Sequence, residues 1–267
     1  PDGPVPLGIE CSGTIAAVGE DVPGLQIGDE VLAIAEFTFG SFVTVPAQYV
    51  VRKPPHLSFE EAATIPVAFL TAHYALNHLG KLKAGERVLI HSATGGVGLA
   101  ALQLAQQAGA EVFATAGSAE KRDLLRWLGV QHVMDSRSLA FADEVLETTH
   151  GEGVDVVLNS LAGDGIRKSL SILRPLGRFL EIGKRDIYQD SRLGLSPFRR
   201  SLSFFAIDMD PVVHERPSLV AEMLQELVVG LQTGRLSALP HRVFPLSNAV
   251  GAFRHMAQAK HIGKVVL

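Results

Sequence analysis

The stretch Ile90-His91-Ser92-Ala93-Thr94-Gly95-Gly96-Val97-Gly98 decides the predicted fold of this chain. It begins within the short apolar segment Arg87–His91, predicted to be a buried strand, and leads into a helix predicted from about Val97 to Ala108. The small residues with the spacing of the pattern G-x-G-x-x-G are Ala93, Gly95 and Gly98. Because small residues let the backbone approach a ligand closely, this segment predicts a site for the pyrophosphate of a dinucleotide, with N–H groups from Gly96 onward facing the phosphates.

Strand and helix patterns alternate from this turn onward. The later strands are predicted at Glu111–Ala116, His132–Met134, Val154–Asn159, Arg178–Ile182 and Ser203–Asp208. Helices are predicted between them at Ala119–Leu128, Phe141–Thr149 and Gly163–Leu173. Parallel strands need a crossover connection, and a helix supplies it. The repeated units therefore predict an α/β fold with a doubly wound parallel sheet of the Rossmann type.

The segments on either side carry other patterns. Short strands are predicted at Ile9–Val18, Glu30–Ala35 and Phe42–Val51, a spacing that favours a small, partial barrel. Further helices are predicted from Ser58 to Leu79 with an interruption at Pro66, at Arg216–Gly234 and at Ser247–Lys260, and further strands begin at His241 and Gly263. We therefore expect a substrate domain at residues 1–66, a dinucleotide-binding domain at residues 67–235 and a return to the substrate domain at residues 236–267.

The composition excludes several classes of protein. Hydrophobic residues make up 47% and charged residues 19% of the chain, so it is not an intrinsically disordered protein. No apolar run approaches the roughly 20 residues of a membrane-spanning helix, and no secretory signal is visible. The net charge of −4 argues against nucleic acid as a partner. The single cysteine, Cys11, supplies neither an internal disulfide nor a structural zinc site, so we expect a soluble cytoplasmic protein that binds no metal and no membrane.

The second predicted strand bears on which dinucleotide is bound. NAD sites usually place an acidic residue about 20 residues beyond the first small residue of the turn, where it binds the ribose 2′-hydroxyl. The corresponding stretch, Phe113-Ala114-Thr115-Ala116-Gly117-Ser118, has no acidic residue, so we predict NADPH, whose 2′-phosphate suits hydroxyls and cations. The candidate groups for that phosphate are Thr115, Ser118, Lys121, Arg122 and Arg137. The alternative is that Lys121 and Arg122 belong only to the solvated face of a helix.

The chain resembles the medium-chain dehydrogenase/reductase superfamily over nearly its whole length. The segments that carry the resemblance are Gly8-Ile9-Glu10-Cys11-Ser12-Gly13, Gly28-Asp29-Glu30-Val31, Ala93–Gly98 and Gly263-Lys264-Val265-Val266-Leu267. Members of this superfamily join a Rossmann domain to a barrel-like (GroES-like) substrate domain. Zinc-dependent members have a histidine between the Gly and Glu of the first segment, where this chain has Ile9. The resemblance therefore implies an enzyme without a catalytic zinc.

Within the superfamily, the chain is similar to the enoyl reductase domains of modular polyketide synthases and animal-type fatty acid synthases. The segments that carry this similarity are Pro66–Ala72, Val157–Gly163, Phe179–Asp186 and Phe253–Lys264. It implies NADPH-dependent reduction of an α,β-unsaturated thioester held on the phosphopantetheine of an acyl carrier protein, with neighbouring synthase domains as partners. Such domains carry a further strand-rich portion before the segment that starts at Gly8, so the chain is expected to begin inside a larger polypeptide or to lack upstream residues.

The strand ends and the similar segments also point to site residues. Lys184 follows the predicted strand Arg178–Ile182, at the edge where open α/β sheets bind ligands, and Asp208 ends the last strand of the sheet. The similarity implies that this pair delivers the proton or stabilises the enolate; the alternative is an ordinary surface ion pair. The further residues expected to contact the cofactor are Thr71, Thr94, Gly96, Val97, Asn159, Leu161, Gly183 and Lys264.

The proton donor and the overall reaction stay open at this point. Some relatives place a tyrosine in the loop that corresponds to Ala35–Phe42, which has none here, so water or Lys184 is expected to supply the proton. If the γ-carbon of the substrate carried a leaving group, the enolate could instead close a ring. Two other functions also stay open: a free-standing NADPH:quinone reductase, and a non-catalytic NADPH-binding module used in assembly.

Overall fold

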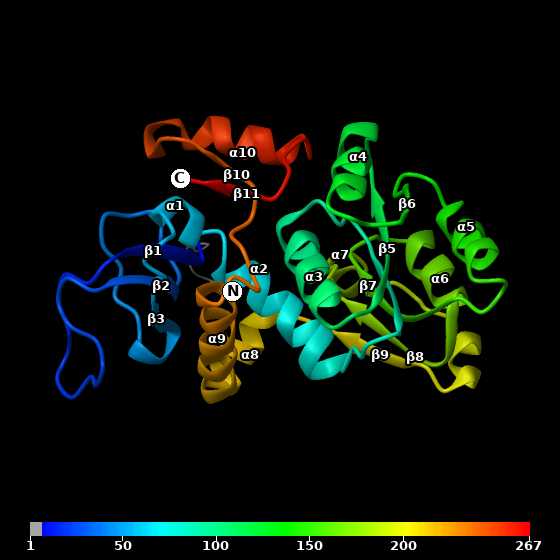
Figure 1. Ribbon diagram of the computed structural model, residues 1–267, viewed down its shortest axis with the longest axis horizontal. Helices are drawn as coiled ribbons and strands as arrows, with labels where there is room; N and C mark the ends of the chain where they lie inside the picture. Colours follow the sequence, from blue (N-terminus) through cyan, green and yellow to red (C-terminus); the bar gives the residue numbers. More distant parts are fainter. Residues whose placement is uncertain (1–6) are drawn as a thin grey trace. The chain divides into compact units, whose positions relative to one another are not determined.

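A parallel sheet forms the centre of one compact unit, Ala72–Met209, of the computed structural model, which describes residues 7–267 (Figure 1). Its six strands are β4 (Arg87–Ile90), β5 (Glu111–Ala116), β6 (His132–Asp135), β7 (Val154–Asn159), β8 (Leu173–Glu181) and β9 (Ser203–Ala206). They lie in the order β6-β5-β4-β7-β8-β9 and every neighbouring pair is parallel. This is the strand order of a Rossmann sheet, so the predicted fold is confirmed. The order reverses between β4 and β7, where such sheets bind their ligands.

Helices connect these strands and bury their apolar side chains against the sheet. They are α3 (Gly96–Gln107), α4 (Ala119–Trp127), α5 (Phe141–Thr148) and α6 (Asp164–Ser171), of which α5 and α6 lie side by side (Figure 1). Leu89, Phe113, Phe141, Val157 and Phe179 are fully buried in one cluster, which explains why the strands read as continuous apolar runs. Two short helices after β8, α7 (Arg185–Tyr188) and the 3₁₀ helix η3 (Ser196–Arg200), were not predicted.

The other compact unit is built from two separate stretches of the chain, residues 7–71 and 210–267 of the described part. Strands β1 (Glu10–Thr14), β2 (Glu30–Ile34) and β3 (Val50–Arg52) form an antiparallel sheet, and β10 (His241–Val243) pairs in parallel with β11 (Lys264–Val266). Its helices are α1 (Phe59–Ala62), α2 (Pro66–His73, which runs into the first unit), α8 (Met209–Glu215), α9 (Pro217–Gln232), α10 (Ala249–Ala257) and the 3₁₀ helices η1 (Ala47–Tyr49) and η4 (Leu246–Asn248). No helix of residues 7–267 has both the length and the apolarity needed to cross a bilayer.

Two predicted elements differ from the structure. The predicted strand Phe42–Val51 is wrong, because only its end pairs with β2 as part of β3. Pro46 cannot donate a ladder hydrogen bond and instead precedes the 3₁₀ turn of η1, while the side chain of Phe42 is exposed. The predicted helix up to Leu79 changes to a π-helix, η2 (Tyr74–Leu79), after α2.

The limits of the compact units differ from the predicted domain limits. The boundaries fall after Thr71 and after Met209, where the sequence predicted residues 66 and 235, and residues 1–6 of the first predicted domain lie outside the described residues. The main difference is helix α9, which packs on β3 and η1 and so belongs with the antiparallel sheet. Its buried residues recur at helical spacing, which identifies an amphipathic helix but not its partner.

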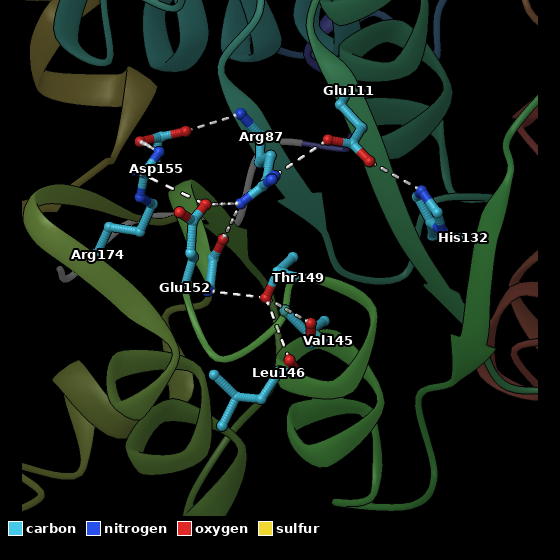
Figure 2. A network of polar contacts seen from close by, with 10 residues as sticks. Arg87, Glu111, His132, Val145, Leu146, Thr149, Glu152, Asp155 and Arg174 are labelled. Carbon is cyan, nitrogen blue, oxygen red and sulfur yellow. Dashed lines mark hydrogen bonds and ion pairs between the residues drawn. The ribbon is translucent and has the colours of Figure 1, made fainter.

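A network of charged groups joins the amino-terminal ends of the central strands, at the edge of the sheet opposite the glycine turn (Figure 2). Arg87 Nη1 lies 2.6 Å from Glu152 Oε2, and its Nε lies 3.1 Å from Glu111 Oε2. The backbone N–H of Arg87 donates to Asp155 Oδ2 at 2.9 Å, and Arg174 Nη1 lies 3.2 Å from the other oxygen of Asp155. Three carboxylates thus meet two guanidinium groups, with one net negative charge, where β4, β5, β7 and β8 begin.

We expect Arg87→Met to lower the free energy of unfolding by about 1 kcal/mol, because Glu111 and Glu152 lose the guanidinium group that they share, while Asp155 keeps its bond from the backbone N–H. The measurement is urea unfolding followed by circular dichroism. Arg126→Met is the matched control: Arg126 forms an exposed pair with Asp123 one helical turn away, and its loss should change the free energy by less than about 0.5 kcal/mol. Equal stability of the two variants would contradict a stabilising role for the network.

Candidate functional site

The glycine turn lies between β4 and α3, and its shape depends on close contact between its two ends. The N–H of Gly95 donates to the carbonyl of Ser92 at 2.9 Å, and the N–H of Ala93 donates to Thr115 O at 2.9 Å. A Cβ atom at Gly98 would lie 2.6 Å from Ala93 Cα, a distance that real Cβ atoms do not adopt. Only glycine at this position therefore lets the first turn of α3 lie directly against the turn.

The first turn of α3 is arranged as a phosphate site. Gly95 is the N-cap residue, and no side chain of the described chain caps the helix. The N–H groups of Gly96, Val97 and Gly98 point out of the helix end, where they and the helix dipole favour negative charge. Thr94 is buried beside them, and Gly95 to Val97 are partly exposed. The geometry of the turn is compatible with the pyrophosphate of a dinucleotide, and the contact itself stays a prediction.

Asn159 and Glu181 form a buried polar pair at the carboxyl ends of β7 and β8. Asn159 Nδ2 donates to Glu181 Oε2 at 2.6 Å and to Leu161 O at 2.8 Å. Glu181 Oε1 accepts from the N–H of Gly183 at 2.6 Å. Asn159 and Leu161 were predicted to contact the cofactor; the structure shows that the amide of Asn159 is fully buried and shapes the loop that contains Leu161.

Glu181 is a residue of the site that the sequence reasoning missed. Its burial raises the pKa of the carboxyl to about 7, although the hydrogen bonds from Asn159 and Gly183 act in the opposite direction. The sequence does contain a pattern that could have identified Glu181: an ionisable residue at the end of an otherwise apolar buried strand. Through Oε1, Glu181 orients the turn that carries Gly183 and leads to Lys184.

Lys184 and Asp208 are brought together by neighbouring parallel strands. They follow β8 and β9, whose pairing continues through the hydrogen bond from Ile207 N to Glu181 O at 2.8 Å. Lys184 Nζ lies 2.7 Å from Asp208 Oδ1, and the two side chains are 47% and 36% exposed. The structure thus places an accessible, charge-paired ammonium group at the carboxyl edge of the sheet.

Two of the cations predicted to hold a 2′-phosphate, Lys121 and Arg137, lie close together. Arg137 lies over Gly117, with Nε 3.1 Å from the position of a Cβ there. Burial, and then the neighbouring charge of Arg137, lower the pKa of Lys121. The hydroxyl of Ser118 accepts from the N–H of Lys121 at 3.4 Å and caps α4. Two cations close enough to repel each other, beside a hydroxyl at a helix start, fit a phosphate.

Arg122 and Thr115 have other roles. Arg122 Nη1 lies 3.1 Å from Asp135 Oδ2 and donates to the carbonyl of Ala116 at 3.2 Å, so its charge is already paired. Thr115 was predicted to contact the cofactor, and that contact stays a prediction. Its side chain is fully buried, and its hydroxyl lies 3.0 Å from His91 Nδ1 inside the sheet. Alternation along β5 turns this hydroxyl to the interior.

Thr71 and Lys264, the remaining predicted cofactor contacts, lie in the unit of residues 7–71 and 210–267. The hydroxyl of Thr71 donates to Val67 O at 2.7 Å, within its own helix. Lys264 Nζ pairs with Glu10 Oε1, and Glu10 Oε2 accepts from the N–H of Val67 at 2.8 Å. Both side chains are therefore engaged inside this unit, and their contact with a cofactor stays a prediction.

Metal ligands were expected to be absent. Within residues 7–267, no three histidine, cysteine, aspartate or glutamate side chains are grouped so that they could hold a metal ion. Ile9, at the position of the zinc-dependent histidine, is half exposed. The absence of a catalytic zinc stays a prediction for the whole protein.

Two protein-family models match the chain. One, described as zinc-binding dehydrogenase, matches residues 128–267, and the other, described as alcohol dehydrogenase GroES-like domain, matches residues 1–55. The first model covers part of the parallel-sheet unit and the carboxyl-terminal stretch, and the second covers the antiparallel sheet.

Individual relatives agree with these matches. A phenolphthiocerol/phthiocerol polyketide synthase polypeptide of Mycobacterium tuberculosis is 48% identical over all of this chain, which spans 12% of that protein's length. The crystal structure of the CurK enoyl reductase is 49% identical, with a TM-score of 0.88 over 98% of this chain and 78% of that one. The nucleotide-binding subdomain of the PpsC enoyl reductase domain from M. tuberculosis is 50% identical, with a TM-score of 0.62 over 65% of this chain and 97% of that one.

Proposed function

The chain belongs to the zinc-binding dehydrogenase family and, within it, to the enoyl reductase domains of polyketide synthases, and on this premise we propose that it reduces an α,β-unsaturated thioester with NADPH. The membership confirms the resemblance predicted from the sequence. The observation that carries the proposal is the placement of the glycine turn and the Lys184–Asp208 pair at the same carboxyl edge of one parallel sheet.

The cofactor is held by residues of the parallel-sheet unit. The N–H groups of Gly96 to Gly98 receive the pyrophosphate, and Lys121, Arg137 and Ser118 receive the 2′-phosphate. The stretch Phe113–Ser118 offers no carboxylate that would repel this phosphate. When bound, NADPH supplies a hydride to the β-carbon of the enoyl thioester.

Lys184 acts on the other end of the double bond. Addition of hydride at the β-carbon leaves an enolate, whose negative charge needs a positive partner and whose α-carbon needs a proton. The ammonium of Lys184 supplies the charge first and then the proton, and the ion pair with Asp208 holds it at the sheet edge. Solvent returns the proton to the half-exposed Lys184 after each turnover.

The partners follow from the relatives' architecture. We propose that the chain works as one domain of a larger cytoplasmic synthase, beside other synthase domains. Its substrate is then the acyl chain on the phosphopantetheine of an acyl carrier protein.

The decisive experiment measures NADPH absorbance with a crotonyl-pantetheine thioester and identifies the product by mass. We expect NADPH consumption and a product heavier than the substrate by two hydrogens. If the chain binds NADPH but consumes it with no enoyl thioester, the result would contradict the proposal and favour a non-catalytic NADPH-binding module. Consumption with quinones alone would replace the proposal by quinone reduction.

We predict that Lys121→Ala with Arg137→Ala raises the KM for NADPH by about tenfold or more and leaves the KM for NADH nearly unchanged, because each lost charge-assisted hydrogen bond is worth about 1.5–3 kcal/mol. Steady-state kinetics with both cofactors measures this ratio. Arg122→Ala is the matched control, since its charge is paired with Asp135, and it should alter the ratio much less. An equal loss for NADPH and NADH would remove the phosphate role.

Lys184→Met is expected to lower kcat by about 10²-fold or more, because it removes the proton donor and the positive charge near the enolate. The dissociation constant of NADPH, measured by calorimetry, should stay within about twofold, since the turn and the cations that hold the cofactor are unchanged. Lys168→Met, which removes another lysine near the end of α6, serves as the control. An unchanged kcat for Lys184→Met would assign the proton to solvent.

A further inference from the structure

His91 is a buried titratable residue with no part in the function proposed above. It follows β4 directly and precedes the glycine turn, and its ring is enclosed, edge-on to Phe141 at a centroid distance of 4.8 Å. Its Nδ1 lies 3.0 Å from Thr115 Oγ1 on β5, and its Nε2 lies 2.9 Å from Ser169 Oγ on α6. Burial lowers the pKa of His91 to about 3, so the ring is neutral. A neutral ring has one donor and one acceptor nitrogen.

The surrounding hydrogen bonds determine which nitrogen carries the proton. Ser169 Oγ donates its only hydrogen to Gly165 O at 2.7 Å, so it accepts from His91 Nε2–H. His91 Nδ1 is then an acceptor, and the hydroxyl of Thr115 donates to it. The oxygen of Thr115 in turn accepts from the N–H of Ser92 at 3.4 Å. The bonds run in one direction, from the backbone of the glycine turn to the backbone of α6.

Ser92, at the start of this series, adopts a conformation that needs support. Its φ of +51° lies in the left-handed region, which is unfavourable for a residue other than glycine. Its carbonyl accepts from the N–H of Gly95, and its hydroxyl accepts from Ser160 at 3.0 Å across the β4–β7 boundary. A Cβ at Gly98 would lie 2.7 Å from the same carbonyl. The orientation of the Ser92 peptide therefore decides where the first turn of α3 can lie.

We propose that His91 is a positioning residue for dinucleotide binding: as the Nε2–H tautomer, it holds Thr115 so that the Ser92 peptide keeps the glycine turn in its binding shape. The ligand named here, NADPH, rests on the proposed function. His91 itself touches neither cofactor nor substrate, because Thr115 and Ser92 stand between it and the turn.

Two substitutions test the contributions of the two ring nitrogens of His91 separately. In His91→Asn, the side-chain oxygen occupies the place of Nδ1 and still accepts from Thr115; in His91→Gln, the amide nitrogen occupies the place of Nε2 and still donates to Ser169. Calorimetry should show that His91→Asn binds NADPH within about threefold of the unmodified chain, whereas His91→Gln binds at least about tenfold more weakly. His91→Gln should raise KM more than it lowers kcat. Equal affinity of the two variants, or the reverse order, would overturn the proposal.

A second pair of variants keeps the test valid if changes at His91 impair folding. Thr115→Val has nearly the shape of threonine but no hydroxyl, and Thr115→Ser keeps the hydroxyl. Thr115→Val should weaken NADPH binding as His91→Gln does, and Thr115→Ser should restore it. Similar affinity in both would show that His91 acts by packing alone and would overturn the proposal.

The tautomer is measured without any cofactor, by ¹⁵N nuclear magnetic resonance of the histidine rings. We expect an unprotonated Nδ1 and a protonated Nε2 that persist as the pH falls well below the ordinary pKa of histidine, about 6.5. A protonated Nδ1 would overturn the proposal. If the unmodified chain shows the expected tautomer but does not bind NADPH, the proposed function and the ligand assigned here are overturned. If the unmodified chain binds NADPH normally but His91→Asn binds it as weakly as His91→Gln does, only the role of His91 is overturned.

Discussion

The close contact at Gly98 is the constraint on which the site depends. Because glycine has no Cβ, α3 can begin against Ala93 and the Ser92 carbonyl, at the end of the central strand β4. The N–H groups of its first turn then point out at the edge where the strand order reverses. Any larger residue would push the helix away from the strand, and the same N–H groups would no longer converge on one place.

Charged residues serve different purposes at the two edges of the parallel sheet. At the amino-terminal edge, Arg87 and its carboxylate partners bind one another in a network that links the strand ends. At the carboxyl edge, Lys184 and Asp208 are paired but accessible, and the buried Glu181 has a raised pKa. The first arrangement ties the strand ends together, while the second leaves an accessible charged pair at the edge where we propose that the reaction takes place.

Several polar residues near the candidate site form hydrogen bonds that hold the loops around it. Asn159 and Glu181 hold the loops after β7 and β8, and Thr115, which was expected at the phosphate, links His91 to the glycine turn. Their hydrogen-bonding groups are buried and already satisfied. The groups that we propose to bind the cofactor are backbone N–H groups and cations at the surface.

The sequence alone determined the elements whose pattern is local. Strands β5 and β7 have the predicted limits, because an apolar run between polar residues is sufficient to define a buried strand, and the small residues of the glycine turn identified the binding edge. Only the tertiary structure decided that α9 packs on the antiparallel sheet, that Arg122 is paired with Asp135, and that His91 meets side chains 24 and 78 residues away. Those outcomes depend on which strands and helices become neighbours, and the spacing of residues along one segment carries no information about the segment that packs against it.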